Sequence, residues 1–434
     1  MLASLIVRKR NRVLTIKITA MKTLSRITSA LLGVLLATGA LAEKPESTMF
    51  YMNSRCDYYK TTFTMASHLV VLQFSINGSD SLNFIFDTGV GRTLITELSN
   101  PYIVSLNQAR QVKVRGLGNS ESVDGVLSQG NDLSLGKIYG KDQEILVVPN
   151  NLIDLSSRVG HKVNGVIGRS IFERFVVEIS YTNRTVQFYN PQKFNRKIHK
   201  EEEVIPVELI DGRPFITAIV TINGKEIPVK LLFDTGMSFG LWLDPSTNKD
   251  IKPSEVRRQE VLGQGLNGDL SGSISRVEKF QVGKFSFSNV IAAFPDSNSI
   301  AETASDNGRN GSVGAEIFRR FNVVIDYQNK RIILRKNSSY KEPFRYDMSG
   351  LEFGSIVAGL PFYKIVSVGV NSPAAESGLL ENDELKSING RSAQFLSMPE
   401  ITEMLRNKEG KTIRVTVLRN GEKVKVKFRL RRMV

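Results

Sequence analysis

The chain has 434 residues, too many for one ordinary domain, and its length predicts two or three domains. Hydrophobic residues make up 41% and charged residues 23%, a globular composition that excludes a wholly disordered chain, a collagen and a polytopic membrane protein. One cysteine and three scattered histidines exclude an intrachain disulfide framework and leave little for a zinc site or a Ser-His-Asp triad. We therefore expect no metal and no cofactor.

The formal net charge of +15 is unevenly placed, because the first 42 residues carry seven Lys or Arg and no Asp or Glu. Two of these basic residues precede a short apolar run over residues 31–36, and Ala40 and Ala42 give the small-x-small pattern of signal cleavage. We predict that residues 1–42 are a secretory leader, with Met21 as the better start, and that the protein is exported to the periplasm or the cell exterior. The run is short for a bilayer span, and an uncleaved membrane anchor is the alternative.

A second basic cluster ends the chain. Residues 411–434 hold nine Lys or Arg against one acidic residue, Glu422. The text K-V-K-V-K-F-R-L-R alternates charged and apolar residues, which predicts a strand with one buried and one solvated face. Nucleic-acid binding is the alternative, but no interleaved aromatic residues and no known motif support it, so we expect no nucleic-acid partner.

The central part of the chain contains an internal repeat. The text S-I-N-G-S-D-S-L-N-F-I-F-D-T-G returns as T-I-N-G-K-E-I-P-V-K-L-L-F-D-T-G, which places Asp87 and Asp234 147 residues apart. A second pair of segments, N-G-V-I-G-R-S-I-F-E-R-F and N-G-S-V-G-A-E-I-F-R-R-F, is identical at seven of twelve positions at an offset of 146. Short β-branched and aromatic runs bounded by Gly, Asn or Asp predict two copies of one β-rich lobe, over residues 60–195 and 205–337.

Two apolar strands that each end in Asp-Thr-Gly suit a shared pair of carboxylates. The apolar residues hold each strand in a core, and the aspartate emerges at its end. Gly89 and Gly236 let the backbone turn closely and leave amides for the carboxylates, while Thr88 and Thr235 are small enough to be buried and to hydrogen-bond across a two-fold axis. If the lobes face each other, the aspartates share one proton, and one activates water while the other polarises the scissile carbonyl.

The doubled hydrophobic-hydrophobic-D-T-G resembles the pepsin and retropepsin aspartic peptidases. In that family each lobe carries a second mark, hydrophobic-hydrophobic-Gly, which residues 166–168 match and residues 312–314 (Ser-Val-Gly) match except at the first position. The resemblance implies a mainly β, two-lobed acid-protease fold and an aspartic endopeptidase with Asp87 and Asp234 as the catalytic pair.

The residues after each D-T-G differ from the pepsin pattern. Pepsins carry Ser or Thr there, which hydrogen-bonds the ionised carboxylate, and retroviral peptidases carry Ala; this chain carries Val90 and Met237. Without that hydrogen bond the pair should titrate at higher pH, so we predict activity at weakly acidic to neutral pH.

Two glycine-bearing stretches follow the aspartates at matching places. Gly116 and Gly118 lie in the first lobe, and Gly263 and Gly265 lie 147 residues later. We predict that they form the tips of flaps that cover the substrate and exclude water. Ordinary turns are the alternative.

Residues 345–434 resemble a PDZ domain of the kind found in bacterial envelope proteases, through the text N-S-P-A-A-E-S-G-L-L-E-N-D-E-L-K-S-I-N-G. Such a domain is β-rich with two short helices. The resemblance implies that Gly350, Leu351, Glu352 and Phe353 form a loop whose amides hold a peptide C-terminus, although Glu352 replaces the usual Gly. A PDZ fold that only packs on the peptidase is the alternative.

The combined prediction is an exported aspartic endopeptidase whose PDZ domain positions polypeptide substrates. One alternative is a non-catalytic envelope scaffold that binds peptides. A weaker one is a glycoside hydrolase, which would hold its two carboxyl groups about 5 Å or more apart.

Overall fold

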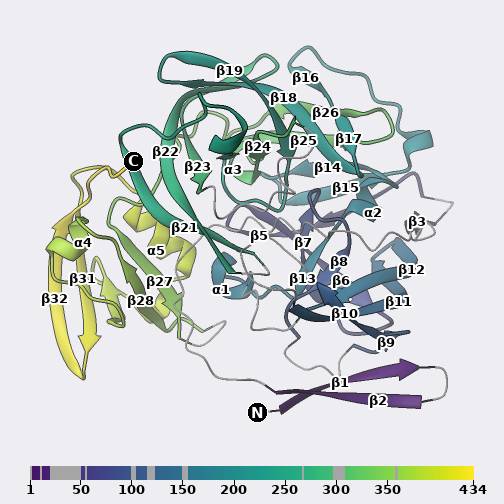
Figure 1. Cartoon of the computed structure of the whole chain (residues 1–434), viewed down its shortest axis with the longest axis horizontal. Coiled ribbons are helices and arrows are strands. Elements are labelled where there is room, and N and C mark those ends of the chain that lie inside the picture. Colours follow the sequence, from purple (N-terminus) through teal and green to yellow (C-terminus); the bar gives the residue numbers. More distant parts are fainter. Residues whose placement is uncertain are drawn as a thin grey trace.

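The computed structural model describes residues 2–9, 12–19, 50–53, 56–98, 104–114, 123–148, 155–265, 268–296, 308–356 and 360–434. Most of the described residues lie in β-strands and few lie in helices, which confirms the prediction of a mainly β fold. Figure 1 shows two β-rich lobes and a smaller C-terminal unit, in light green and yellow, beside them.

The first lobe is built on a nine-stranded sheet with the order β10-β11-β12-β8-β13-β7-β6-β5, to which β3 is added through β12. β7 lies near the centre of this sheet, between β6 and β13, and is buried over most of its length. The strands span Phe50–Met52 (β3), Thr64–Ala66 (β5), Leu69–Ile76 (β6), Leu82–Asp87 (β7), Thr93–Ile95 (β8), Arg110–Val114 (β10), Val123–Leu135 (β11), Ile138–Val147 (β12) and Gly165–Gly168 (β13).

The second lobe repeats this arrangement in an eight-stranded sheet with the order β17-β18-β19-β24-β20-β23-β22-β21. β19 is placed as β7 is, between an antiparallel neighbour, β18, and a parallel one, β24. The strands span Glu208–Ile210 (β17), Arg213–Ile222 (β18), Lys225–Phe233 (β19), Leu241–Leu243 (β20), Arg257–Gly265 (β21), Gly268–Val282 (β22), Phe285–Pro295 (β23) and Gly311–Val313 (β24).

A six-stranded sheet with the order β16-β26-β25-β14-β15-β4 joins the lobes. β14 of the first lobe pairs antiparallel with β25 of the second, with Val177 opposite Ile325. β4, at the start of the first lobe, pairs antiparallel with β15 and forms one edge of this sheet. The strands span Tyr58–Thr62 (β4), Val176–Ser180 (β14), Thr185–Tyr189 (β15), Glu202–Pro206 (β16), Phe321–Asp326 (β25) and Arg331–Lys336 (β26).

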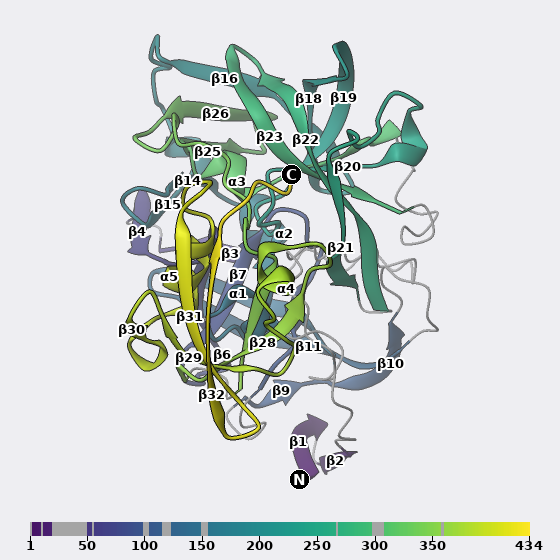
Figure 2. The same ribbon diagram turned by 90° about the vertical axis from the view of Figure 1, so that its left-hand side faces the viewer.

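The C-terminal unit has its own sheet, ordered β27-β28-β29-β31-β32 with β30 paired to β29, and its own apolar core. Figure 2 shows this unit in front of the two lobes. In its longest helix, α5, Ser397 and Glu400 form a capping box that starts the helix. The elements span Leu351–Ser355 (β27), Tyr363–Val368 (β28), Pro373–Glu376 (α4), Glu384–Ile388 (β29), Arg391–Ser392 (β30), Met398–Leu405 (α5), Thr412–Arg419 (β31) and Glu422–Arg429 (β32).

Short helices and a small three-stranded sheet complete the described structure. In the lobes the helices span Leu155–Val159 (α1), Arg169–Phe172 (α2) and Ala315–Phe318 (α3). Within the predicted leader, Leu2–Lys9 (β1) and Arg12–Thr19 (β2) form a hairpin, and β1 pairs with Leu106–Asn107 (β9). The rest of the predicted leader lies outside the described residues, and its cleavage stays a prediction.

One apolar core runs through both lobes and supports the ends of β7 and β19. Phe86 stacks on Phe172 of α2 with ring centroids 4.3 Å apart, and Phe233 stacks on Phe318 of α3 at 3.8 Å. In both lobes, therefore, the phenylalanine directly before the aspartate stacks on a phenylalanine of the short helix that follows in the same lobe.

Candidate active site

Each aspartate of the repeat lies where a buried central strand of its lobe ends. β7 pairs in parallel with β13, so that Asp87 stands opposite Gly168. In the second lobe the Asp234 N–H donates to the Val313 carbonyl oxygen of β24 at 3.0 Å. Only 1% of Asp87 and 3% of Asp234 is exposed. The two strand ends thus deliver both carboxyl groups into a site from which water is largely excluded.

The two threonines of the repeat connect the aspartate loops. The Thr88 N–H donates to Oγ1 of Thr235 at 3.0 Å, and the Thr235 N–H donates to Oγ1 of Thr88 at 3.1 Å. Each hydroxyl also donates to the carbonyl oxygen before the opposite aspartate, Thr88 to Phe233 and Thr235 to Phe86. The hydrogen bonds predicted across the two-fold axis are therefore present, and they fix one loop against the other.

Gly89 and Gly236 bring the backbone against the carboxyl groups. The Gly89 N–H donates to Oδ1 of Asp87 at 2.6 Å, and the Gly236 N–H donates to Oδ1 of Asp234 at 3.0 Å. A Cβ atom at Gly236 would lie 2.2 Å from Cγ of Asp87, and one at Gly89 would lie 3.4 Å from Cγ of Asp234. Each glycine thus packs on the carboxyl group of the other lobe, so the two aspartates form one site.

Asp87 and Asp234 hydrogen-bond each other, and their titration is shared. Burial raises the pKa of Asp87 well above its usual value, and the negative charge of Asp234 raises it further. Burial also raises the pKa of Asp234, but the positive charge of Arg309 and the hydrogen bond with Asp87 act in the opposite direction. These effects favour the protonated form of Asp87 and the ionised form of Asp234.

Arg309 is a residue of this site that sequence-based prediction missed. Only 7% of it is exposed; its Nε donates to the Gly311 carbonyl oxygen at 2.9 Å and its Nη2 donates to Oγ of Ser312 at 2.5 Å. Ser312 is the residue at which the second lobe departs from the hydrophobic-hydrophobic-Gly pattern, and its hydroxyl oxygen accepts a hydrogen bond from the buried guanidinium of Arg309. A signal was available, because the offset of 146 pairs Arg309 with an apolar residue, Val163.

Gly168 and Gly314, which end the hydrophobic-hydrophobic-Gly pattern of each lobe, permit close packing behind the two aspartate loops. A Cβ atom at Gly168 would lie 1.6 Å from the carbonyl oxygen of Asp87, and one at Gly314 would lie 2.5 Å from that of Met237. Val90 and Met237, which follow the two D-T-G sequences, are each 1% exposed. Their side chains carry no hydroxyl, so neither can donate a hydrogen bond to an aspartate.

The predicted flaps are only partly within the described structure. Gly116 and Gly118 lie outside the described residues. Gly263 and Gly265 lie in β21, which pairs antiparallel with β22 over a long stretch, and Gly265 stands opposite Gly268. A hairpin is thus present at the second place, and its role as a cover for substrate stays a prediction.

Residues 350–353 were predicted to be a loop that holds a peptide carboxylate, but residues 351–353 lie in β27, and two N–H groups of this segment already have acceptors. The Gly350 N–H donates to Oδ2 of Asp347 at 2.6 Å, and the Leu351 N–H donates to Oγ of Ser349 at 3.0 Å. Gly350 has φ of +79°, and a Cβ atom there would lie 2.1 Å from Cβ of Ser372, so the turn requires glycine. Binding of a carboxylate by this loop stays a prediction.

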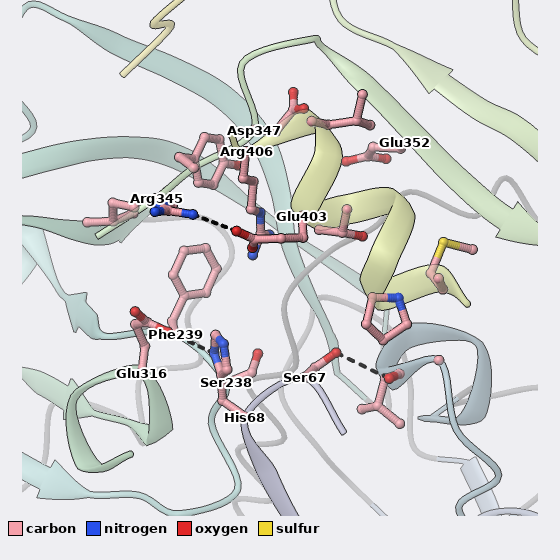
Figure 3. Close-up of a pocket in the computed structure, with 18 of the residues that line it drawn as sticks. Ser67, His68, Ser238, Phe239, Glu316, Arg345, Asp347, Glu352, Glu403 and Arg406 are labelled. Atoms are coloured by element: carbon pink, nitrogen blue, oxygen red, sulfur yellow. Dashed lines mark hydrogen bonds and ion pairs between the residues drawn. The ribbon is translucent and has the colours of Figure 1, made fainter. Parts of the chain in front are cut away.

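A cavity of about 500 Å³ separates the C-terminal unit from the lobes. Glu352, Phe353 and residues of α5 line one side of it. Figure 3 shows His68 and Glu316 on the other side, where Nδ1 of His68 lies 2.8 Å from Oε2 of Glu316. This ion pair connects the turn after β5 in the first lobe to α3 in the second. Neither aspartate of the pair lines the cavity, so the two sites are distinct.

Metal-binding clusters and membrane-spanning helices are both absent from the described residues. In that part of the chain no group of three or more His, Cys, Asp or Glu could hold a metal ion. No helix within it has the length and apolar character needed to cross a membrane. Cys56 is a free thiol.

Two protein families and one known protein match parts of the chain. The aspartyl protease family matches residues 72–171 and 218–317, one copy in each lobe, and the PDZ domain family matches residues 364–419. A segment of 83 residues is 35% identical to the carboxy-terminal processing protease CtpB of Bacillus subtilis (strain 168). That segment covers 19% of this chain and 16% of the relative, so the likeness to that protein is partial.

Proposed function

Because the chain carries two aspartyl protease domains and a C-terminal PDZ domain, as its sequence predicted, we propose that it hydrolyses peptide bonds as an aspartic endopeptidase. The observation that carries this proposal is the buried, mutually hydrogen-bonded pair of Asp87 and Asp234. Ionised Asp234 takes a proton from a water molecule, whose oxygen attacks the scissile carbonyl carbon, while protonated Asp87 donates its proton to the carbonyl oxygen. Carboxyl groups in contact do not suit a glycoside hydrolase, which needs about 5 Å or more between them.

The PDZ domain supplies a second place for polypeptide beside the catalytic lobes. The cavity between this domain and the lobes is lined by residues of β27 and α5, and it supports capture of an extended segment there. Binding of a C-terminal carboxylate at residues 350–353 has to compete with Asp347 and Ser349, which already accept two of the loop's N–H groups.

Export is a further part of the proposal, and the basic, apolar and small-x-small order of residues 22–42 supports it. Mass spectrometry of the protein from a bacterial host should find Glu43 as its first residue in the cell-envelope or secreted fraction. An N-terminus at Met1 or Met21 in the cytosolic fraction would refute export.

The enzymatic proposal is tested with the protein expressed from Glu43 and a diverse peptide mixture between pH 3 and pH 8. Asp87→Asn and Asp234→Asn should each lower kcat/KM by about 10²–10⁴-fold, because each removes one partner of the acid–base pair. Asp80→Asn is the control, since it changes an exposed carboxylate in the turn that precedes β7. If the unmutated protein folds and binds peptides but cleaves none at any pH, the non-catalytic scaffold replaces the enzyme.

A further inference from the structure

The two lobes are repeats, yet their catalytic loops are supported by different chemistry. In the first lobe, Val163 and Val166 are fully buried apolar core residues. At the equivalent positions of the second lobe stand Arg309 and Ser312, which are also buried. The first lobe shows that this fold packs well with two valines, so the arginine is not needed to build the loop.

The guanidinium of Arg309 is held in a fixed place against β24, the strand that pairs with β19. It donates to the Gly311 carbonyl oxygen and to Oγ of Ser312, two residues of β24. β24 pairs in parallel with β19, with Ser312 opposite Leu232, and Asp234 follows directly after β19. Two hydrogen bonds therefore fix the arginine on the strand that adjoins the aspartate loop.

A buried guanidinium is costly unless an opposite charge compensates for its lost hydration. Of the neighbouring charges that act on Arg309, that of Asp234 has the largest effect, ahead of those of Arg213 and Asp244. Burial lowers the pKa of Arg309 to about 10, so it stays cationic at every pH at which a carboxylate pair works. The charge of Arg309 therefore interacts mainly with Asp234.

We propose that Arg309 is a positioning residue that breaks the symmetry of the aspartate pair and assigns the base role to Asp234. Its charge favours the ionised form of Asp234, so the shared proton stays on Asp87. This inference rests on the proposed peptidase function for its catalytic meaning, whereas the assignment of the proton is a property of the folded protein alone.

The other groups that face the pair do not provide this asymmetry. Asp87 and Asp234 act on each other, and the N–H groups of Gly236 and Met237 donate toward Asp234. Tyr327, in the turn after β25, is buried and is affected by the charges of both aspartates; burial raises the pKa of its hydroxyl well above the usual value, so it is neutral. Among these neighbours, Arg309 is the group that brings a positive charge to bear on Asp234.

Loss of the positive charge shifts the titration of the pair in a defined direction. A nearby cation favours the carboxylate form, so its removal raises the pKa of Asp234. Both limbs of the pH profile of kcat/KM then move to higher pH, by about one unit. The Asp87–Asp234 hydrogen bond becomes more nearly symmetric.

Three variants separate charge from packing. Arg309→Gln removes the charge but can still donate to Gly311 and Ser312, Arg309→Lys keeps the charge, and Arg309→Met with Ser312→Val replaces the polar pair by an apolar one, as in the first lobe. Arg213→Gln is the control, because Arg213 acts on Arg309 but not notably on Asp234. Thermal unfolding of each protein establishes that it is folded.

The readout is the titration of the ¹³C-labelled carboxyl carbons of Asp87 and Asp234, assigned with the Asp87→Asn and Asp234→Asn proteins, beside the pH profile of peptide cleavage. We expect the titration of Asp234 to move up by about one unit in Arg309→Gln and in the double variant, and to stay in place in Arg309→Lys and Arg213→Gln. An unchanged titration in Arg309→Gln, or an equal shift in Arg309→Lys, overturns the proposal. Because the carbon titration needs no turnover, it decides the role of Arg309 even if no peptide is cleaved.

Discussion

At the scale of single residues, Val90 and Met237 decide which hydrogen bonds the paired carboxylates of Asp87 and Asp234 lack. Pepsins place a hydroxyl at these positions, and here both side chains are buried and apolar. The pair is active while it holds one proton. Because burial raises the pKa of Asp87 and no hydroxyl at these positions stabilises its ionised form, the second proton is lost only at higher pH. Activity should therefore extend from weakly acidic to neutral pH.

Val90→Thr tests this reasoning, since it offers a hydroxyl to the ionised form of Asp87. A hydrogen bond to the carboxylate lowers its pKa, so the alkaline limb of kcat/KM should move down by about 0.5–1 pH unit. Val90→Ala is the control, because it changes the same side chain without adding a hydrogen-bond donor, and its alkaline limb should stay within about 0.2 unit of that of the unmutated protein. A steep loss of activity between pH 5 and pH 7 in the unmutated protein would contradict the argument.

At the scale of elements, the repeat made most of the site predictable. Each apolar strand that ends in Asp-Thr-Gly is in place, and the threonine hydrogen bonds follow from the symmetry that the repeat implies. Pairings between distant segments were not predictable, such as β14 with β25 and β15 with β4, because strand partners are chosen by the burial of whole faces rather than by local sequence. Arg309 was missed because a lone arginine in a polar stretch normally faces solvent.

The junction between β21 and the PDZ domain carries a prediction of its own. The Tyr346 hydroxyl donates to Oε2 of Glu260 on β21, and Nε of Arg258 lies 2.7 Å from the other oxygen of that carboxylate. Burial raises the pKa of Glu260, so the hydrogen bond from Tyr346 helps to keep it ionised. Tyr346→Phe leaves this carboxylate with one donor fewer, which should weaken the attachment of the linker by about 1.5–3 kcal/mol.

We expect Tyr346→Phe to speed tryptic cleavage after Lys341 or Arg345 by about tenfold, because cleavage follows local opening of the linker. Tyr340→Phe is the matched control: it removes a tyrosine hydrogen bond, to the Ser286 carbonyl oxygen, that does not reach β21. Mass spectrometry of the early fragments gives both rates. Equal rates for the two variants would show that the Tyr346–Glu260 contact does not hold the linker.

At the scale of the whole molecule, the PDZ domain is placed so that the segment predicted to bind peptide and the lobes line one cavity. Arg258 connects β21 to the loop, since its Nη1 lies 3.7 Å from Oδ2 of Asp347. The same oxygen accepts the N–H of Gly350. The carboxylate of Asp347 thus lies between the long hairpin of the second lobe and the segment predicted to bind peptide, so a peptide carboxylate would compete with Asp347 for the N–H of Gly350.

This competition predicts weak discrimination between free and amidated peptide C-termini. In the full chain carrying Asp87→Asn, which prevents cleavage, fluorescence anisotropy should give Kd values for the acid and amide forms of one peptide within about threefold of each other, because Asp347 holds the N–H of Gly350. Asp347→Ala frees that donor and removes a negative charge, so the acid form should gain about tenfold over the amide. Glu403→Ala is the control, since it removes a carboxylate of the cavity wall without freeing a loop N–H. A tenfold preference for the acid before any change at Asp347, or an equal gain in Glu403→Ala, would show that the side chain of Asp347 does not occupy the carboxylate position.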